Sequence, residues 1–476
     1  MLFSSLTFIF VFLPVTLFLY YILPRQGRNI ILMLASIFFY AWGGVSLTAL
    51  LIISIIGNYV FGLWINKTNQ KNKLALIAGV SFNVILLGTF KYGNFIVENI
   101  NVVGERLGLS PFKNPGIILP LGISFFTFQA LSYLIDVYRK ETPVQKNLFY
   151  LALFISFFPQ LIAGPIVRYN YIADQLTNRK ENIENFSKGI ERFVLGLVKK
   201  VIIANQFAIV ASEAFKLSPE ILPQQMAWAG VICYSFQIYF DFAGYSDMAI
   251  GLGRMFGFKL PENFDYPYIT GSIRQFWNHW HITLGSWLKN YLYFPLGGSK
   301  KGLQRTYINL LVVFIICGFW HGASWNFLAW GLIHGAFMIF ERAWFEEKVL
   351  KRIGKVLPVV YTFSVATLAW VFFETNNFQH TFYFFKVLFT GNPEFSGGNY
   401  LSSVFNPEFL VIALPAMAGS FGFFRWAEST IAKKYPDARH SLIVTSSKTI
   451  LVLASLIVIT ILLISDTYNP FIYFRF

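Results

Sequence analysis

Runs of apolar residues, separated by short polar and basic segments, recur along the whole sequence. A helix needs about 20 residues to cross the hydrocarbon core of a bilayer, and many of the runs approach that length. Shorter or more polar runs are typical of re-entrant segments, which survive only where protein or a wet cavity shelters the backbone. The pattern predicts an all-α polytopic integral membrane protein with about 11 or 12 transmembrane helices plus re-entrant or amphipathic helices. The runs are Leu6–Leu23, Ile30–Trp42, Leu47–Trp64, Leu74–Phe90, Ile117–Val137, Leu148–Ile166, Phe193–Val210, Met226–Gly251, Tyr307–Phe319, Ser324–Phe340, Leu357–Phe373, Phe409–Phe424 and Thr449–Ile464.

The composition excludes most soluble classes of protein. Of the 476 residues, 55% are hydrophobic and only 13% are charged, and phenylalanine alone occurs 54 times. A soluble chain cannot bury so much apolar surface, because a single core stops growing at about 250–300 residues. A cytosolic enzyme, a nucleic-acid-binding domain, a secreted disulfide scaffold and a disordered chain are therefore excluded. The two cysteines, Cys233 and Cys317, lie inside apolar runs and are interpreted as small buried hydrophobes, so we expect no metal site or redox pair at either.

The charge distribution predicts an orientation. The net charge is +15, and its cations cluster in short loops after the first, third and fifth runs and before the last. Basic loops face the cytoplasm, so we expect both termini on the outer side. The first run lacks a basic leader region and a small-residue cleavage site, so we expect it to be retained as a span. No repeat or linker divides the chain, which predicts one domain over residues 1–476 with an outward tail at 465–476.

The densest polar interruption is residues 272–298, SIRQFWNHWHITLGSWLKNYLYFPLGG. Trp277, His281, Leu284 and Leu288 share one stripe at helical spacing, and His279 falls on the opposite face. The segment therefore reads as an amphipathic helix with His281 facing a packed interior. An interfacial helix whose tryptophans form an aromatic belt is the slightly favoured alternative.

A second interruption, CGFWHGASWNF at residues 317–327, places His321 between two apolar runs. A lone buried histidine is more often a hydrogen-bonded core residue than a catalyst. Here the flanking Gly318 and Gly322 permit close backbone approach or a helix break, and the desolvated setting favours a site. A neutral imidazole, with an ordinary pKa near 6.5, suits the removal of a proton from a hydroxyl at pH 7.

Two further features interrupt the apolar pattern. Asp241 and Asp247, in QIYFDFAGYSDMAIG, are ionisable groups at membrane depth that orient a histidine, bind an ion or cap backbone; we favour a structural or orienting role.

The last six residues, FIYFRF, contain four aromatics. They form either an interfacial anchor or a segment that carries Tyr473 back into the protein, where its phenol needs a base to act as a covalent carrier. The other histidines are interpreted as structural or loop residues: His334, His380 and His440.

These segments resemble the membrane-bound O-acyltransferase (MBOAT) family, in particular its bacterial alginate O-acetylation branch. The resemblance covers nearly the whole chain and is carried by ILPLGISFFTFQALSYLIDVYR, FPQLIAGPIVRY, QIYFDFAGYSDMAIGLG, RQFWNHWHITLGSWLKNYLYFPLGG and GFWHGASWNF. It implies the MBOAT fold, a catalytic core at about 117–345, and transfer of an acyl group from a cytoplasmic thioester toward an extracytoplasmic polysaccharide. By the same resemblance His321 matches the family's catalytic histidine and His281 its second histidine.

The resemblance also implies a mechanism. Acetyl-CoA is the expected donor, with no tightly bound cofactor and no metal. His321 acts as general base on the accepting hydroxyl, and His281 orients His321, donates to the oxyanion or positions the substrate. In the related D-alanyl transfer system a small separate protein ends in Phe-x-Tyr-x-x-Phe, and the tail of this chain reproduces that pattern around Tyr473 as a candidate acyl relay. Orienting or structural roles are assigned to Asp241, Asp247, Asn278 and Trp320, and contacts to CoA phosphates, from charge and position, to Arg274, Lys289, Lys300 and Lys301.

The sequence leaves several alternative functions open. Within the family, a D-alanyl transferase for teichoic acid would need an acylated carrier protein instead of CoA. A transporter or flippase would move substrate without chemistry, and a structural subunit of an export complex would carry the histidines as passengers. The expected setting is the bacterial cytoplasmic membrane, with extracytoplasmic acetylesterase-like partner proteins, a polysaccharide reached indirectly and no nucleic acid.

Overall fold

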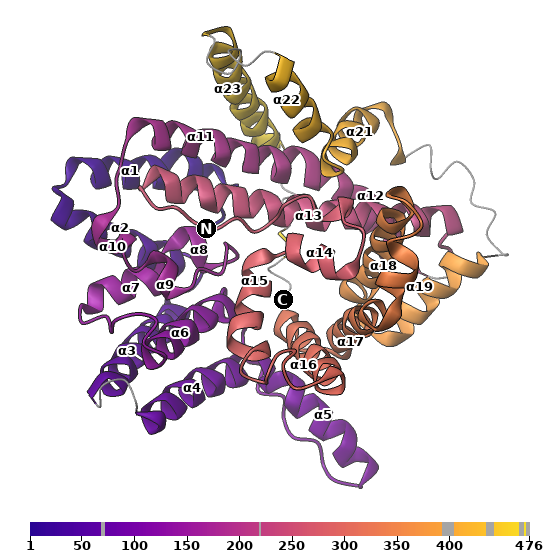
Figure 1. The fold of residues 1–476 in the computed structure, drawn as a ribbon, viewed down its shortest axis with the longest axis horizontal. Coiled ribbons are helices and arrows are strands. Elements are labelled where there is room, and N and C mark those ends of the chain that lie inside the picture. The colour runs from indigo at the N-terminus through magenta and orange to yellow at the C-terminus, as the bar shows by residue number, and fades with distance from the viewer. Residues whose placement is uncertain (68–71, 219, 393–403, 435–441, 466–470, 473–476) are drawn as a thin grey trace. The chain divides into compact units, whose positions relative to one another are not determined.

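The computed structural model describes residues 1–67, 72–218, 220–392, 404–434, 442–465 and 471–472 (Figure 1). Every regular element within these ranges is a helix, as the apolar runs predict. A helix satisfies its own backbone hydrogen bonds, which is why segments that face lipid adopt this form. The chain divides into two compact units that alternate along the sequence. Unit 1 comprises residues 1–192, 248–261 and 289–292, and unit 2 comprises residues 193–247, 262–288 and 293–476.

Unit 1 is built around helix α6 (Ile123–Tyr138), which is buried along nearly its whole length. It packs against α3 (Val45–Lys67) and α4 (Lys73–Leu87). Gly79 on α4 makes this approach possible, because a Cβ there would overlap the side chain of Leu134 on α6. The other helices of unit 1 are η1 (Phe8–Phe12), α1 (Leu13–Ile22), α2 (Arg25–Ala41), η2 (Gly88–Tyr92), α5 (Gly93–Arg106), α7 (Leu148–Ser156), α8 (Phe158–Leu161), α9 (Tyr169–Ile172), α10 (Gln175–Asn178) and the first part of α11 (Ile183–Leu197).

A partly buried ionic network ties the first helices of the chain to the loop before α11, within unit 1. The hydroxyl of Tyr20 donates to Glu181 Oε1 at 2.7 Å, and Arg28 and Arg179 reach the same oxygen at 3.3 and 3.5 Å. Burial alone would raise the pKa of the Glu181 carboxyl. The Tyr20 hydrogen bond, a hydrogen bond from the Glu181 backbone N–H and the two guanidinium groups together outweigh burial and leave that pKa below its ordinary value, so Glu181 stays ionised at neutral pH.

Unit 2 contains a closely packed helix pair, α16 (Leu303–His321) and α17 (Trp325–Phe340). A Cβ added at Gly318 or at Gly331 would overlap a backbone carbonyl oxygen of the opposite helix. Small residues at such an interface let two membrane helices approach backbone to backbone. The remaining helices, some of which extend into unit 1, are η3 (Val198–Ala204), α12 (Asn205–Lys216), α13 (Gln224–Met255), η4 (Pro267–Ile269), α14 (Ile273–His279), α15 (Ile282–Leu288), η5 (Lys289–Tyr293), η6 (Glu341–Leu350), α18 (Val356–Glu374), α19 (Phe378–Thr390), α21 (Pro407–Ser420), α22 (Phe423–Lys434) and α23 (Leu442–Ser465).

Six helical segments among the described residues are long and apolar enough to cross a membrane, or seven if the bent pair α21 and α22 forms one span. The apolar pattern predicts about 11 or 12 spans because it also counts shorter runs. One such run, Leu148–Ile166, is divided: α7 ends at Ser156 and the chain resumes in the four-residue α8. The six segments are Val45–Lys67, Lys73–Arg106, Ile183–Lys216, Leu303–His321, Val356–Glu374 and Val444–Ser465.

Candidate active site

His321 is the last residue of α16 and is only 2% exposed. Gly322 follows it in extended backbone and ends the helix. Three aromatic rings surround the imidazole: the ring centroids of Trp320, Trp330 and Phe373 lie 5.0, 5.1 and 5.3 Å from that of His321. These rings come from α16, α17 and α18, so the packing of three helices determines where the imidazole sits. They also keep bulk water away from it, which strengthens any electrostatic interaction that it makes.

His281 lies in the short connection between helices α14 and α15 and not inside a helix. The prediction of one amphipathic helix through Trp277, His281, Leu284 and Leu288 is wrong, because α14 ends at His279 and α15 begins at Ile282. His281 has a φ of +44°, in the left-handed region that a non-glycine residue rarely adopts. Its side chain is nevertheless fully buried, and its ring centroid lies 6.5 Å from that of His321.

Asn263 provides the physical reason for this break. Its Oδ1 accepts hydrogen bonds from the Thr283 N–H at 3.2 Å and the Thr283 hydroxyl at 2.8 Å, and its backbone oxygen accepts from the Ile282 N–H at 2.9 Å. The same Oδ1 lies 3.1 Å from His281 Nδ1. A backbone N–H can only donate, so this amide atom is the oxygen and His281 carries its proton on Nδ1. Neutral His281 therefore presents Nε2 as a hydrogen-bond acceptor.

Asn263, Trp330 and Phe373 are site residues that the sequence did not single out. Trp330 and Phe373 lie in apolar runs, where a ring at a catalytic position looks the same as a core ring. Asn263 lies in a polar stretch, ENFDYPY, between two recognisable segments, and nothing in its neighbourhood marks it. Its importance comes from contacts with residues 18 and 20 positions later.

We expect Asn263→Leu to lower the stability of the protein by about 1–3 kcal/mol, because it leaves the Thr283 N–H without its acceptor. We also expect it to reduce acyl transfer per folded molecule, because His281 is no longer held in one tautomer and orientation. The matched control is Asn83→Leu, which breaks a buried amide pair with Asn58 in unit 1. Thermal unfolding and transfer rates of both variants check this; equal loss of activity in the two would contradict a positioning role.

The remaining predicted site residues differ in their surroundings. Trp320 is buried and its ring lies against both histidines, with centroids 6.0 Å from His281 and 5.0 Å from His321. Asn278 is exposed. The Arg274 guanidinium pairs with Glu346 of η6. The three candidate lysines for CoA phosphates are exposed: Lys289, Lys300 and Lys301.

The two buried aspartates of α13 each pair with a lysine of the π-helix η3. Lys199 Nζ lies 2.6 Å from Asp247 Oδ2, and Lys200 Nζ lies 2.6 Å from Asp241 Oδ1. Any role of the aspartates beyond these pairs stays a prediction. Tyr473 and His440 lie outside the described residues.

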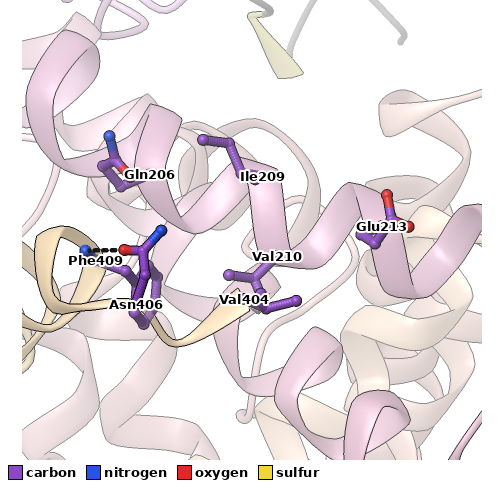
Figure 2. Close-up of a pocket in the computed structure, with 7 residues that line it drawn as sticks. All are labelled: Gln206, Ile209, Val210, Glu213, Val404, Asn406 and Phe409. Atoms are coloured by element: carbon purple, nitrogen blue, oxygen red, sulfur yellow. Dashed lines mark hydrogen bonds between the residues drawn. The ribbon is translucent and has the colours of Figure 1, made fainter. Parts of the chain in front are cut away.

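One described cavity lies apart from the histidines (Figure 2). It has a volume of about 310 Å³ and opens between α12 and the segment that leads into α21. Asn406 uses its side-chain oxygen to cap α21, accepting the Phe409 N–H at 2.8 Å. None of the residues that line the cavity was a candidate from the sequence: Gln206, Ile209, Val210, Glu213, Val404, Asn406 and Phe409.

Comparisons with known proteins identify the family. The sequence matches the membrane-bound O-acyltransferase family over residues 128–373. It is 40% identical to a probable alginate O-acetylase of Pseudomonas putida, with all of both chains covered. It is 42% identical to a peptidoglycan O-acetyltransferase of Helicobacter pylori, covering 80% of this chain and 78% of that one. A teichoic acid D-alanyltransferase of Bacillus subtilis is 30% identical over 55% of this chain and 70% of its own. The chain therefore belongs to the membrane-bound O-acyltransferase family and is a multi-pass membrane acyltransferase.

Proposed function

We propose that this protein moves an acetyl group from cytoplasmic acetyl-CoA across the membrane for the O-acetylation of an extracytoplasmic polysaccharide. The observation that carries the proposal is the pair of buried histidines, 6.5 Å apart, in a chain that is 40% identical along its whole length to a probable alginate O-acetylase. The peptidoglycan O-acetyltransferase relative also acts on a glycan by its name, so the acceptor class is a cell-surface glycan. The similarity to the D-alanyltransferase covers little more than half of this chain, which favours acetyl over D-alanyl transfer.

The chemistry of the proposal uses His321 as general base. A ring nitrogen of His321 takes the proton of the accepting hydroxyl while the hydroxyl oxygen attacks the thioester carbonyl. The carbon–sulfur bond then breaks, and the proton passes to the leaving thiolate of CoA. Because His321 is 2% exposed, substrate can reach it only if side chains around it move. The aromatic rings of Trp320, Trp330 and Phe373 are the groups that would have to move to admit substrate.

For His281 we propose one of the three roles that the sequence left open. With its Nδ1 proton committed to Asn263, neutral His281 offers a lone pair at Nε2 and has no second N–H to give to an oxyanion. We therefore favour a role in which His281 accepts a hydrogen bond and positions a substrate hydroxyl, over direct stabilisation of the oxyanion.

The proposal includes the orientation and partners expected from the sequence. The protein lies in the bacterial cytoplasmic membrane with both termini outside, and acetylesterase-like proteins on the outer side complete the transfer to the polymer. Among the CoA-phosphate candidates we retain Lys289, Lys300 and Lys301, because their side chains are exposed and a phosphate can reach them. Tyr473 is the proposed acyl relay between the histidines and the outer partners.

Purified protein in lipid nanodiscs, incubated with acetyl-labelled CoA, tests the donor. We expect consumption of the thioester and label on the protein or on an added glycan acceptor, with no turnover of a D-alanyl-loaded carrier protein offered in parallel. Turnover of the D-alanyl carrier alone would replace the proposal with the teichoic acid alternative. A protein that neither hydrolyses the thioester nor becomes labelled would fit a transporter and would contradict the proposal.

A further inference from the structure

The two described residues that follow α23, Phe471 and Ile472, are buried inside unit 2. Phe471 is 5% exposed and Ile472 is 4% exposed. The backbone N–H of Ile472 donates to Asp241 Oδ2 at 2.8 Å, and the Phe471 ring stacks on Tyr245 with centroids 4.6 Å apart. This part of the tail therefore packs inside the protein and does not lie at a lipid-facing surface as an interfacial anchor would.

Both oxygens of Asp241 are used, and for different purposes. Oδ1 pairs with Lys200 Nζ at 2.6 Å, while Oδ2 accepts the Ile472 N–H from the tail. Lys200 Nζ also lies 5.9 Å from the centroid of the Phe471 ring, within cation–π range. The lysine thus neutralises the carboxylate and contacts the tail at the same time.

The helices present these groups on facing surfaces. Asp241 and Tyr245 are four residues apart on α13 and therefore share one face, one turn apart. Lys200 lies in the π-helix η3, a wider turn that is often found at functional sites. The last helix, α23, packs against η3, the helix that carries Lys200.

A buried ion pair is a poor source of stability, because the cost of removing both charges from water offsets their attraction. The side chains of Lys200 and Asp241 are 3% and 2% exposed, so nearly the full desolvation cost applies to this pair. A charged carboxylate is, however, a stronger acceptor for a buried backbone N–H than a neutral group. We therefore interpret the Lys200–Asp241 pair as a means of holding the tail, and not as a source of stability between helices.

We propose that Lys200, Asp241 and Tyr245 form a seat that clamps the C-terminal segment at Phe471–Ile472. The existence of the seat does not depend on the reaction. Its consequence for acetyl transfer rests on the proposed function, in which the next residue, Tyr473, carries the acyl group. In that setting Lys200 and Asp241 are positioning residues.

Digestion of the full-length protein with carboxypeptidase Y tests the seat, with mass spectrometry measuring the fraction of chains shortened past Ile472. The test variant is Lys200→Met/Asp241→Leu, because apolar replacement of a whole buried pair often leaves the fold stable. We expect truncation past Ile472 to be about tenfold faster or more in this variant than in the wild type, since the tail loses a charge-assisted hydrogen bond. The melting temperature should stay within a few degrees of the wild-type value.

Two controls separate the clamp from general stability and from chemistry. Glu181→Gln weakens the partly buried ionic network in unit 1 and lowers stability, and we expect its truncation rate to match the wild type. Tyr473→Phe should leave truncation past Ile472 unchanged while abolishing polymer acetylation. Wild-type truncation in the double variant, or equal acceleration in Glu181→Gln, would overturn the seat. Absence of acetyl transfer by the wild-type protein would refute the proposed function and leave the truncation result intact.

Discussion

His321→Ala is expected to lower acetyl transfer by about 10²–10⁴-fold, the contribution typical of a general base. The imidazole is the group on α16 that can take a proton at neutral pH, and alanine leaves only the aromatic rings around an empty space. The protein should still insert and fold, because the three helices that surround the position keep their contacts. Transfer from labelled acetyl-CoA, normalised to folded protein, measures the effect.

His334→Ala is the matched control for this variant. His334 is a buried histidine of α17 in the same aromatic cluster, its ring 4.9 Å from that of Trp330, and Trp277 Nε1–H donates to its Nδ1 at 3.3 Å. Loss of this side chain should lower stability by a similar amount and leave transfer per folded molecule close to that of the wild type. Normal polymer acetylation by His321→Ala would refute the assignment, and an equal loss in both variants would show that His321 acts only through packing.

Gly318→Ala and Gly331→Ala are expected to destabilise the protein by about 1–3 kcal/mol each or more, the range for overpacking a tight interface. A Cβ at either position would overlap a backbone carbonyl oxygen of the opposite helix, which cannot move aside as a flexible side chain would. The helices α16 and α17 must then separate. Gly318 is three residues before His321, so the separation also shifts the imidazole and should reduce acetyl transfer.

Thermal unfolding in detergent compares these variants with Gly88→Ala, where a Cβ would meet nothing within 4 Å. Helical alanine is favoured over glycine, so the control should unfold at or slightly above the wild-type temperature. The two destabilising changes face each other and should not add in the double variant. Unfolding temperatures equal to that of Gly88→Ala would show that the backbones of the two helices are not in contact.

The helical membrane architecture follows from the apolar runs alone, because the backbone of a lipid-exposed segment has few other ways to satisfy its hydrogen bonds. The sequence also singled out His321, since a histidine flanked by glycines between two apolar runs stands out in any window. The resemblance to the family rests on contiguous motifs and needed no structure, and the comparisons confirmed it.

The way in which these segments meet depends on contacts between residues that are far apart in the sequence. Helical spacing predicted a continuous helix through His281, but Asn263, 18 residues earlier, captures the Thr283 N–H and breaks it. The burial of Phe471 depends likewise on Asp241 and Tyr245, and Asp241 lies 231 positions before the Ile472 N–H that it accepts. Local periodicity records which face of a segment is apolar. It carries no information about which distant side chain accepts a given backbone N–H. Hydrogen bonds of this kind determine where His281 and the Phe471–Ile472 segment lie.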